Sequence, residues 1–269
     1  MYTFIKFGGS VITDKTGQEA ADLPLIGQLA NELAQARQAR PDLALILGHG
    51  SGSFGHHYAA RYGIHRGLPP GSDYSGFAHT AAAALRLNRI VVDALLAAGL
   101  PALALQPSAS LQTHAGQITA WHTATLSQAL QHHLIPVIHG DVAFDNAQGS
   151  CIASTEILLT HLALHTPLRP NRIILVGEAG VYSADPRQNP QAQRIPLITA
   201  ANLEVVLHAT TGSHAVDVTG GMRSKLELMW QLVQAIPTLE VHLIGPAPGN
   251  LQAVLLGEDT DVGTIIRMK

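Results

Sequence analysis

Short apolar runs of strand length alternate with longer helix-like segments along the whole chain. The apolar runs lie at Tyr2–Phe7, Leu43–Leu47, Ala102–Leu105, Ile135–Ile138, Arg172–Val176, Glu240–Ile244 and Val262–Arg267. Helical patterns lie at Pro24–Ala39, Gly76–Ala98, His122–Gln131, Thr155–Leu164, Met222–Ala235 and Leu251–Leu256. Because strands that alternate with helices build parallel sheets covered on both faces, this order predicts an α/β fold, a three-layer αβα sandwich with a mostly parallel central sheet.

The sequence shows no internal division. It contains no Pro/Ser/Gly-rich linker, no shift in composition and no repeat of fixed period, and a chain of 269 residues is long enough for one large hydrophobic core. We therefore expect a single domain over residues 1–269, with two lobes at most. In open α/β sheets ligands bind at the carboxyl ends of the strands, so a site is expected in the loops that follow the strands.

Composition and charge exclude several classes of protein. The 16 Lys and Arg residues against 19 Asp and Glu residues give a net charge of −3, and 46% of the residues are hydrophobic. This balance lacks the basic surface of a nucleic-acid-binding protein, and the hydrophobic fraction is too high for a disordered chain. The longest apolar stretches, such as Ile90–Leu100, are shorter than the roughly 20 residues of a membrane span. We expect neither a nucleic-acid partner nor a membrane span.

Two further features favour a cytoplasmic location. Cys151 is the single cysteine and cannot form an internal disulfide. The first residues, MYTFIKFGGS, lack the charged and apolar regions of a secretory signal.

Lysine is scarce relative to arginine. Of the 16 basic residues, four are lysines: Lys6, Lys15, Lys225 and Lys269. Lysine offers a compact point charge on a flexible stem, which the planar fork of arginine does not reproduce. The first three lie in or beside glycine-containing segments, where phosphate groups are commonly bound. Chance placement is the alternative that the count alone leaves open.

Two Gly-Gly pairs stand beside these lysines. Gly8-Gly9 follows the first predicted strand, next to Lys6, and Gly220-Gly221 opens a predicted helix with Lys225 about one turn inside. Backbone N–H groups at such turns and at helix amino ends bind anions. No Walker sequence occurs, so a phosphate site here would have a different construction. An ordinary tight turn is the alternative for either pair.

A third glycine segment, residues 48–56 (GHGSGSFGH), lies between the second predicted strand and a possible helix. Gly50, Gly52 and Gly55 match the dinucleotide pattern G-x-G-x-x-G. The acidic residue at the required spacing, Asp73, lies in a Pro/Gly loop and not at a strand end, which counts against NAD binding. The segment offers unhindered N–H donors and a histidine at its far end, which suits a phosphate or another anion.

Taken in order, these loops resemble the amino acid kinase family, and within it most closely the isopentenyl phosphate kinases. The matching segments, which span nearly the whole chain, are Lys6–Lys15, His49–His56, Gly76–Thr80, Leu87-Asn88, Gly140–Val142, Gly180–Tyr182, Asp185-Pro186 and Asp217–Lys225. The resemblance implies an N-terminal lobe for a phosphate acceptor, a C-terminal lobe for the nucleotide, and a homodimer.

The resemblance also implies a reaction and roles for individual residues. ATP, with Mg²⁺, would phosphorylate isopentenyl phosphate to isopentenyl diphosphate with release of ADP. The catalytic positions are Lys6, Lys15, Lys225 and Glu156, and the acceptor positions are Ser51, Gly52, His56 and Thr155. The nucleotide positions are Lys6, Gly8, Gly9, Gly52, Tyr182, Asp185, Gly220, Gly221 and Lys225. No side chain is assigned to a metal.

His56 is expected to orient the acceptor phosphate as a hydrogen-bond donor. A phosphomonoester has its second pKa at about 6, so it is largely dianionic at neutral pH and needs no general base. Most of the 15 histidines must be incidental. One pair, His161 and His165, has the i, i+4 spacing of zinc ligands but lacks a recognisable acidic partner.

Two segments depart from the family pattern. Ser154-Thr155-Glu156 stands where Ser-Gly-Asp is usual, so threonine replaces a glycine and the carboxylate side chain is one methylene longer. Gly177-Glu178-Ala179 stands where two aspartates are usual, in the nucleotide region.

These departures keep other functions open. One is a related kinase for another small phosphate or phosphonate, such as a fosfomycin-type kinase, and another is a non-catalytic nucleotide-binding protein; a nicotinamide oxidoreductase is a remote fourth. The small residues of Gly76–Ala98, which the resemblance places beside a prenyl pocket, equally suit simple core packing.

Overall fold

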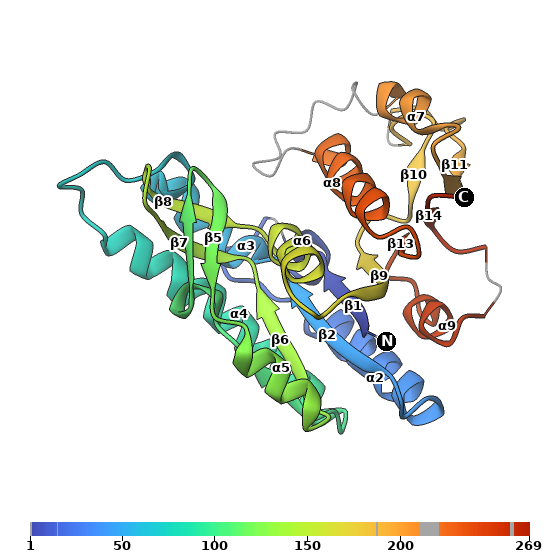
Figure 1. The fold of residues 1–269 in the computed structure, drawn as a ribbon, viewed down its shortest axis with the longest axis horizontal. Helices are drawn as coiled ribbons and strands as arrows, with labels where there is room; N and C mark the ends of the chain where they lie inside the picture. Colours follow the sequence, from blue (N-terminus) through green and yellow to red (C-terminus); the bar gives the residue numbers. More distant parts are fainter. Residues whose placement is uncertain (1, 15, 187, 210–220, 259–260) are drawn as a thin grey trace.

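A computed structural model describes residues 2–14, 16–186, 188–209, 221–258 and 261–269. Within this part of the chain, eight strands form one central sheet (Figure 1). In sheet order they are β12 (Leu197–Ile198), β14 (Thr264–Ile266), β13 (Glu240–Ile244), β9 (Pro170–Val176), β1 (Tyr2–Phe7), β2 (Ala44–His49), β6 (Ile135–His139) and β3 (Ala102–Ala104). All neighbouring pairs are parallel except β13 and β14. The predicted mostly parallel sheet is confirmed.

Helices cover both faces of the central sheet. Successive residues of a strand point to opposite faces, so neighbouring residues of β1 contribute to different buried clusters. Phe4 of β1 belongs to the buried cluster of one face and Ile5 to that of the other. The first cluster includes residues of α5 (Ala124–Gln131), α6 (Thr155–His165), α7 (Leu203–Ala209) and α8 (Gly221–Ala235). The second includes residues of α1 (Gly9–Ile12), α2 (Leu23–Ala39), α3 (Gly52–Tyr62), α4 (Ser75–Ala97) and α9 (Asn250–Leu256). Three layers result, as predicted.

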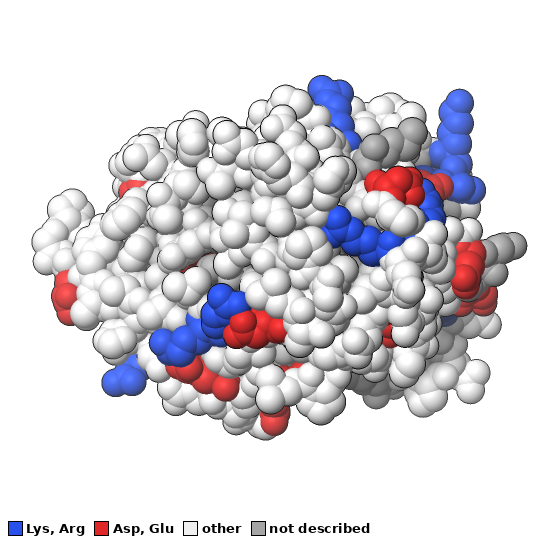
Figure 2. All heavy atoms as spheres, turned by 90° about the horizontal axis from the view of Figure 1, so that it is seen from below, with Lys and Arg blue, Asp and Glu red and all other residues white. Residues whose placement is uncertain are grey.

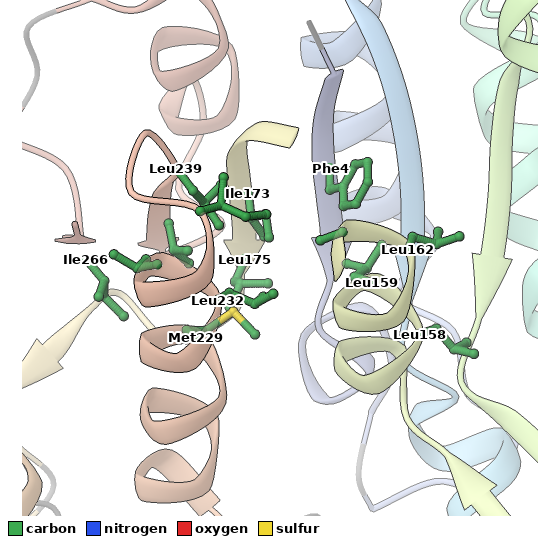
Figure 3. Packing of buried hydrophobic residues seen from close by; sticks show 14 of the residues in the cluster. Phe4, Leu158, Leu159, Leu162, Ile173, Leu175, Met229, Leu232, Leu239 and Ile266 are labelled. Atoms are coloured by element: carbon green, nitrogen blue, oxygen red, sulfur yellow. The ribbon is translucent and has the colours of Figure 1, made fainter. Parts of the chain in front are cut away.

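Figure 3 shows how the first cluster is assembled. Phe4 of β1 lies beside Leu159 and Leu162 of α6, whereas Met229 of α8 lies beside Leu175 of β9. All of these side chains are buried, and burying a leucine, methionine or phenylalanine side chain contributes about 1.5–3 kcal/mol. The packing fixes the first turn of α6 against the ends of β1 and β2, where the glycine segments begin.

A second sheet of four strands was not expected from the sequence. In sheet order its strands are β5 (Gln117–Trp121), β4 (Leu111–His114), β7 (Asp141–Asp145) and β8 (Gly149–Ala153). β4 and β7 are parallel and the other pairs antiparallel. No residue of β5 is fully buried, and β7 begins and ends with aspartate, so neither presents the apolar run that marks the strands of the central sheet.

Shorter elements complete the described fold. β10 (Val181–Tyr182) and β11 (Arg194–Ile195) form a small antiparallel pair. Single 3₁₀ turns lie at Ile64–Arg66 (η1) and Pro107–Ala109 (η2).

The face of the molecule drawn in Figure 2 carries few charged side chains. On the face drawn in Figure 2, acidic and basic side chains lie intermixed among a majority of uncharged residues, so this face presents no broad basic area. Among the described residues, no helix is both long and apolar enough to cross a membrane.

Candidate active site

The glycine segments after β1 and β2 meet at the carboxyl end of the central sheet. A Cβ atom on Gly9 would lie 2.5 Å from the backbone nitrogen of Gly52, and one on Gly50 would lie 2.7 Å from the backbone nitrogen of Gly9. Contacts this close leave no room for a side chain. Glycine is therefore required here by the close approach of the two backbones.

Ser51 and Gly52 stand at the amino end of α3. Gly52 has φ +49°, in the left-handed region, and the N–H groups of Phe54 and Gly55 donate to the Ser51 carbonyl at 3.1 and 3.2 Å. The amino end of an eleven-residue helix carries a partial positive charge. His56 follows in the second turn and is exposed. This arrangement suits a phosphate group.

Lys6 and Glu156 form an ion pair between β1 and the first turn of α6. Their side chains are 12% and 15% exposed, so the pair is largely withdrawn from solvent. Burial raises the pKa of Glu156, but the charge and hydrogen bond of Lys6 and the charge of Lys225 outweigh that effect and lower it. Glu156 is thus ionised at neutral pH and holds the Lys6 ammonium in place.

Lys225 lies one turn inside α8, and Glu156 faces it from α6. Both line a pocket of about 400 Å³ between α6, α8 and β5. Three residues predicted from distant parts of the sequence, Lys6, Glu156 and Lys225, are thereby brought together. His161 and His165 also line this pocket, with ring centroids 5.0 Å apart.

Thr155 lies beneath the site and is 1% exposed. Its hydroxyl donates to the His49 carbonyl at 2.6 Å, and its methyl group occupies the space in front of Gly48, where a Cβ atom would lie 2.4 Å away. The residue that the sequence suggested as an acceptor contact therefore ties α6 to the end of β2.

Two buried histidines at the ends of β2 and β6 were not singled out from the sequence. The rings of His49 and His139 are stacked with centroids 5.6 Å apart, and both are fully buried. Nδ1 of each ring lies 3.0–3.2 Å from the carbonyl of the following glycine. Because a carbonyl only accepts, Nδ1 carries the proton, and Nε2 of His49 accepts from the Asn88 amide at 3.0 Å.

Burial determines the charge of this histidine pair. It lowers the pKa of His49 to about 3 and lowers that of His139, so both rings are neutral at physiological pH. The sequence signal that could have revealed them is a histidine directly before a glycine at two strand ends, His49-Gly50 and His139-Gly140.

Comparisons with known proteins identify the family of this chain. The family model described as "Amino acid kinase family" matches residues 1–243. The chain belongs to the amino acid kinase family. It is 35% identical over 264 residues to the isopentenyl phosphate kinase of Methanothermobacter thermautotrophicus, covering 95% of each chain. It is 34% identical to that of Haloferax volcanii, covering 98% of this chain and 97% of the relative.

A solved structure has the same fold. The crystallised protein described as isopentenyl phosphate kinase superposes with a TM-score of 0.82 at 32% identity, over 99% of this chain and 100% of its own. The expected family and fold are thereby confirmed, and the second sheet belongs to a fold that the two chains share over their whole lengths.

In this amino acid kinase, the predicted nucleotide residues lie on several elements. Tyr182 is half-buried on β10, and the carbonyl of Asp185 accepts from two N–H groups of the following turn. Gly221 is the first residue of α8. Lys15 and Gly220 lie outside the described residues. These assignments stay predictions.

The segment Gly177-Glu178-Ala179 adjoins the first glycine segment. The N–H of Gly8 donates to the Val176 carbonyl at 2.8 Å, so the end of β9 directly contacts the end of β1. Glu178 and Ala179 are both exposed. The departure from the family pattern therefore lies at the rim of the site, where it alters the surface and leaves the strand pairing intact.

The arrangement suits phosphoryl transfer, which depends on positioning and charge neutralisation. Two ammonium groups, one on β1 and one on α8, flank the carboxylate of Glu156, and the glycine segments after β1 and β2 lie at the same end of the sheet. Ammonium groups bind phosphate oxygens without covalent attachment.

Proposed function

We propose that this chain is an ATP-dependent isopentenyl phosphate kinase. The observation that carries the proposal is the combination of near-full-length similarity to isopentenyl phosphate kinases with a Lys6–Glu156–Lys225 cluster beside the glycine segments. An oxygen of the acceptor phosphate would attack the γ-phosphorus of ATP. The bond to the bridging oxygen would break, and ADP would leave.

The proposed roles follow the chemistry of each group. Lys6 and Lys225 would neutralise charge on the transferred phosphoryl, with Lys15 as a third cation, while Glu156 keeps Lys6 in position. Ser51, Gly52 and His56 would bind the acceptor phosphate, supported by the amino end of α3. Gly8, Gly9 and Gly221 would approach the nucleotide phosphates, and Tyr182 and Asp185 would contact the rest of the nucleotide.

Mg²⁺ is proposed as the companion of ATP. Magnesium is usually held by phosphate oxygens and water with few protein ligands, and the site's donors are lysines and N–H groups, while its carboxylate Glu156 is already paired with Lys6. When bound, the ion would neutralise the β- and γ-phosphates.

The apolar tail of the acceptor would lie against α3, α4 and β7. A small buried cluster there includes Ala59, Phe77 and Val142, with Ala81 and Ile152 packed against it. It is separate from the two large clusters of the central sheet. Ala83, farther along α4, belongs to the main core instead, so only the start of this helix is assigned to the acceptor.

An acceptor panel tests the proposed function. The protein with ATP and Mg²⁺ should convert isopentenyl phosphate to the diphosphate, observed by ³¹P NMR, with one ADP released for each diphosphate formed. Fosfomycin should be a poorer acceptor. No turnover of isopentenyl phosphate by folded protein, or a preference for the phosphonate, would contradict the proposal, and ATP binding without transfer to any acceptor would identify a non-catalytic protein.

His56 has a matched control in its neighbour His57, which is also exposed on α3. His56→Ala should raise KM for isopentenyl phosphate while KM for ATP changes little, and His57→Ala should leave both values near those of the unchanged protein. Equal effects of the two substitutions would mean that His56 has no specific role.

The homodimer, the division of the two ligands between two lobes and the cytoplasmic location stay predictions. Sedimentation equilibrium at micromolar concentration tests the first, with the mass of two chains as the expected result.

A further inference from the structure

Two consecutive residues of α6 contact two neighbouring strands of the central sheet. Thr155 donates its hydroxyl hydrogen to the His49 carbonyl at the end of β2, and Glu156 pairs with Lys6 of β1. Lys6 and Gly48 are partners in the parallel register of these strands. The first turn of α6 is therefore attached to one point of the sheet by two adjacent side chains.

The side chain of Thr155 also keeps this turn at a distance from β2. Its methyl group fills the space in front of Gly48, since a Cβ atom added there would lie only 2.4 Å from it, and the residue is 1% exposed. Its hydroxyl lies close to Gly140, whose added Cβ would be 3.4 Å away. With threonine at this position, close packing prevents α6 from moving nearer to β2.

We propose that Thr155 and Glu156 form a matched pair, in which the size of residue 155 sets the length of carboxylate side chain that residue 156 needs to hold Lys6. Thr155 is thus a positioning residue that acts through Glu156. A longer carboxylate spans the gap that the threonine maintains. While Thr155 is present, an aspartate at position 156 is too short to reach the Lys6 ammonium. Once the threonine is removed and α6 lies nearer to β2, a glutamate at position 156 is too long to pair with Lys6 in the same position.

A double-substitution cycle tests the pairing. Glu156→Asp should lower kcat about tenfold, and Thr155→Gly should lower it by a smaller factor. Adding Thr155→Gly to Glu156→Asp should recover about fivefold or more of the kcat lost, since contacting residues couple by factors of this size. KM for isopentenyl phosphate should stay within about twofold throughout, because Lys6 acts on the transferred phosphoryl.

Two single substitutions separate spacing from hydrogen bonding. Thr155→Val keeps the volume and loses the hydroxyl, whereas Thr155→Ser keeps the hydroxyl and loses the methyl group. The carbonyl of His49 retains a second donor, the Gly140 N–H at 2.9 Å, so valine leaves no buried acceptor unpaired. If the size of residue 155 is what matters, the kcat of Thr155→Val should be closer to that of the unchanged protein than the kcat of Thr155→Ser.

A matched control carries the same threonine-to-glycine change near the start of another helix. Thr125 is exposed in the first turn of α5. Thr125→Gly added to Glu156→Asp should recover no activity. Circular dichroism melting of each variant shows whether it is folded at the assay temperature, and only folded variants enter the cycle.

The kinetic cycle rests on the proposed function. A second measurement therefore follows Lys6 itself and requires no kinase activity. The chain has four lysines, and protein labelled with ¹⁵N-lysine should show a slowly exchanging Lys6 Nζ signal, identified by its loss in Lys6→Arg. Glu156→Asp should remove this signal and the double variant should restore it.

The outcomes are distinct. A double variant that only adds the two single losses, in kcat and in the Lys6 signal, overturns the pairing, as does a valine variant more damaged than the serine variant. If the unchanged protein fails to phosphorylate isopentenyl phosphate, the proposed function fails, and the Lys6 signal alone decides whether the pairing holds.

Discussion

At the scale of single residues, the proposed site brings together compact positive charges. Lys6 is 12% exposed and is held by Glu156, and the charge of Lys225 acts on the same carboxylate. A guanidinium is larger and planar and prefers a bidentate partner. In a largely buried pair of this kind, it would displace Glu156 and present its charge at a different point. The scarcity of lysine in the sequence therefore has a positional meaning.

The first prediction concerns these lysines. Lys6→Arg and Lys225→Arg should each lower kcat about a hundredfold, the size of effect seen when one charge-stabilising group is lost from an active site. Lys269→Arg at the exposed carboxyl-terminal residue is the control and should keep full activity. Steady-state ADP release measures all three, and equal tolerance at the three positions would mean that the scarcity of lysine is only compositional.

At the scale of elements, the contact between the glycine segments shapes the site. Gly52 combines a φ of +49° with a Cβ position 2.2 Å from the Thr13 hydroxyl oxygen. Gly52→Ala should therefore lower both activity and the free energy of unfolding. Gly27 in α2 has no atom within 4 Å of an added Cβ, and Gly27→Ala should instead stabilise by about 0.5–1 kcal/mol. Urea unfolding compares them, and a stabilised Gly52→Ala protein would contradict the close approach.

A buried carboxylate connects two turns of the second sheet. Asp145 of β7 is 4% exposed, and burial alone would raise its pKa. Hydrogen bonds outweigh this and lower the pKa. The donors are the N–H groups of Ala115, Gly116, Ala147 and Gln148 and the hydroxyl of Thr113. One side chain thus fastens the turn between β4 and β5 to the turn between β7 and β8.

Asp145→Asn should lower the free energy of unfolding by about 2 kcal/mol at pH 7, because an amide oxygen replaces a charged acceptor and its NH₂ faces donors. A carboxyl whose pKa is lowered by folding stabilises the protein above its unfolded pKa, near 3.8, and loses that contribution as the pH falls below this value. The difference between the two proteins should therefore narrow from pH 4 downward. Urea unfolding at several pH values measures it. Asp42→Asn, at an exposed position, is the control and should change the free energy of unfolding little. A difference in free energy of unfolding between Asp145→Asn and the unchanged protein that does not vary with pH would contradict the role given to the Asp145 carboxylate.

The elements also show what the sequence could predict. The strands of the central sheet are apolar on both faces, and β1 and β13 have the predicted bounds. The second sheet escaped prediction because its strands are short and no residue of β5 is fully buried. The start of α3 is rich in glycine and lies against the first glycine segment. The sequence indicated that Thr155 lies near the site, but it could not show that its side chain packs against Gly48, because that contact exists only in the folded chain.

At the scale of the whole molecule, the site lies where elements from both ends of the chain meet. β1 contributes Lys6, and α8, more than two hundred residues later, contributes Lys225. The sequence predicted both because each lies beside its own Gly-Gly pair. It did not predict the His49–His139 pair, because burial makes these rings neutral and burial is a property of the fold. Ligands that contact β1, α3 and α8 together should hold these parts against one another.

Cys151 provides a measure of that effect. The thiol is 4% exposed on β8, and burial raises its pKa, so a thiol reagent should modify it only when the structure opens. Ligands that bind only the closed, folded state lower the population of open molecules. At a hundredfold excess over Kd they stabilise the closed state by about 2.7 kcal/mol. ATP with isopentenyl phosphate should therefore slow labelling by 5,5′-dithiobis(2-nitrobenzoate) about a hundredfold at saturation, and ATP alone should slow it less.

Thiol release at 412 nm follows the reaction, and Cys151→Ser gives the baseline. Labelling of the ligand-free protein at the rate of a small free thiol would show that β8 is not closed in solution, and labelling unaffected by ligands would show that they do not hold the two ends of the chain together.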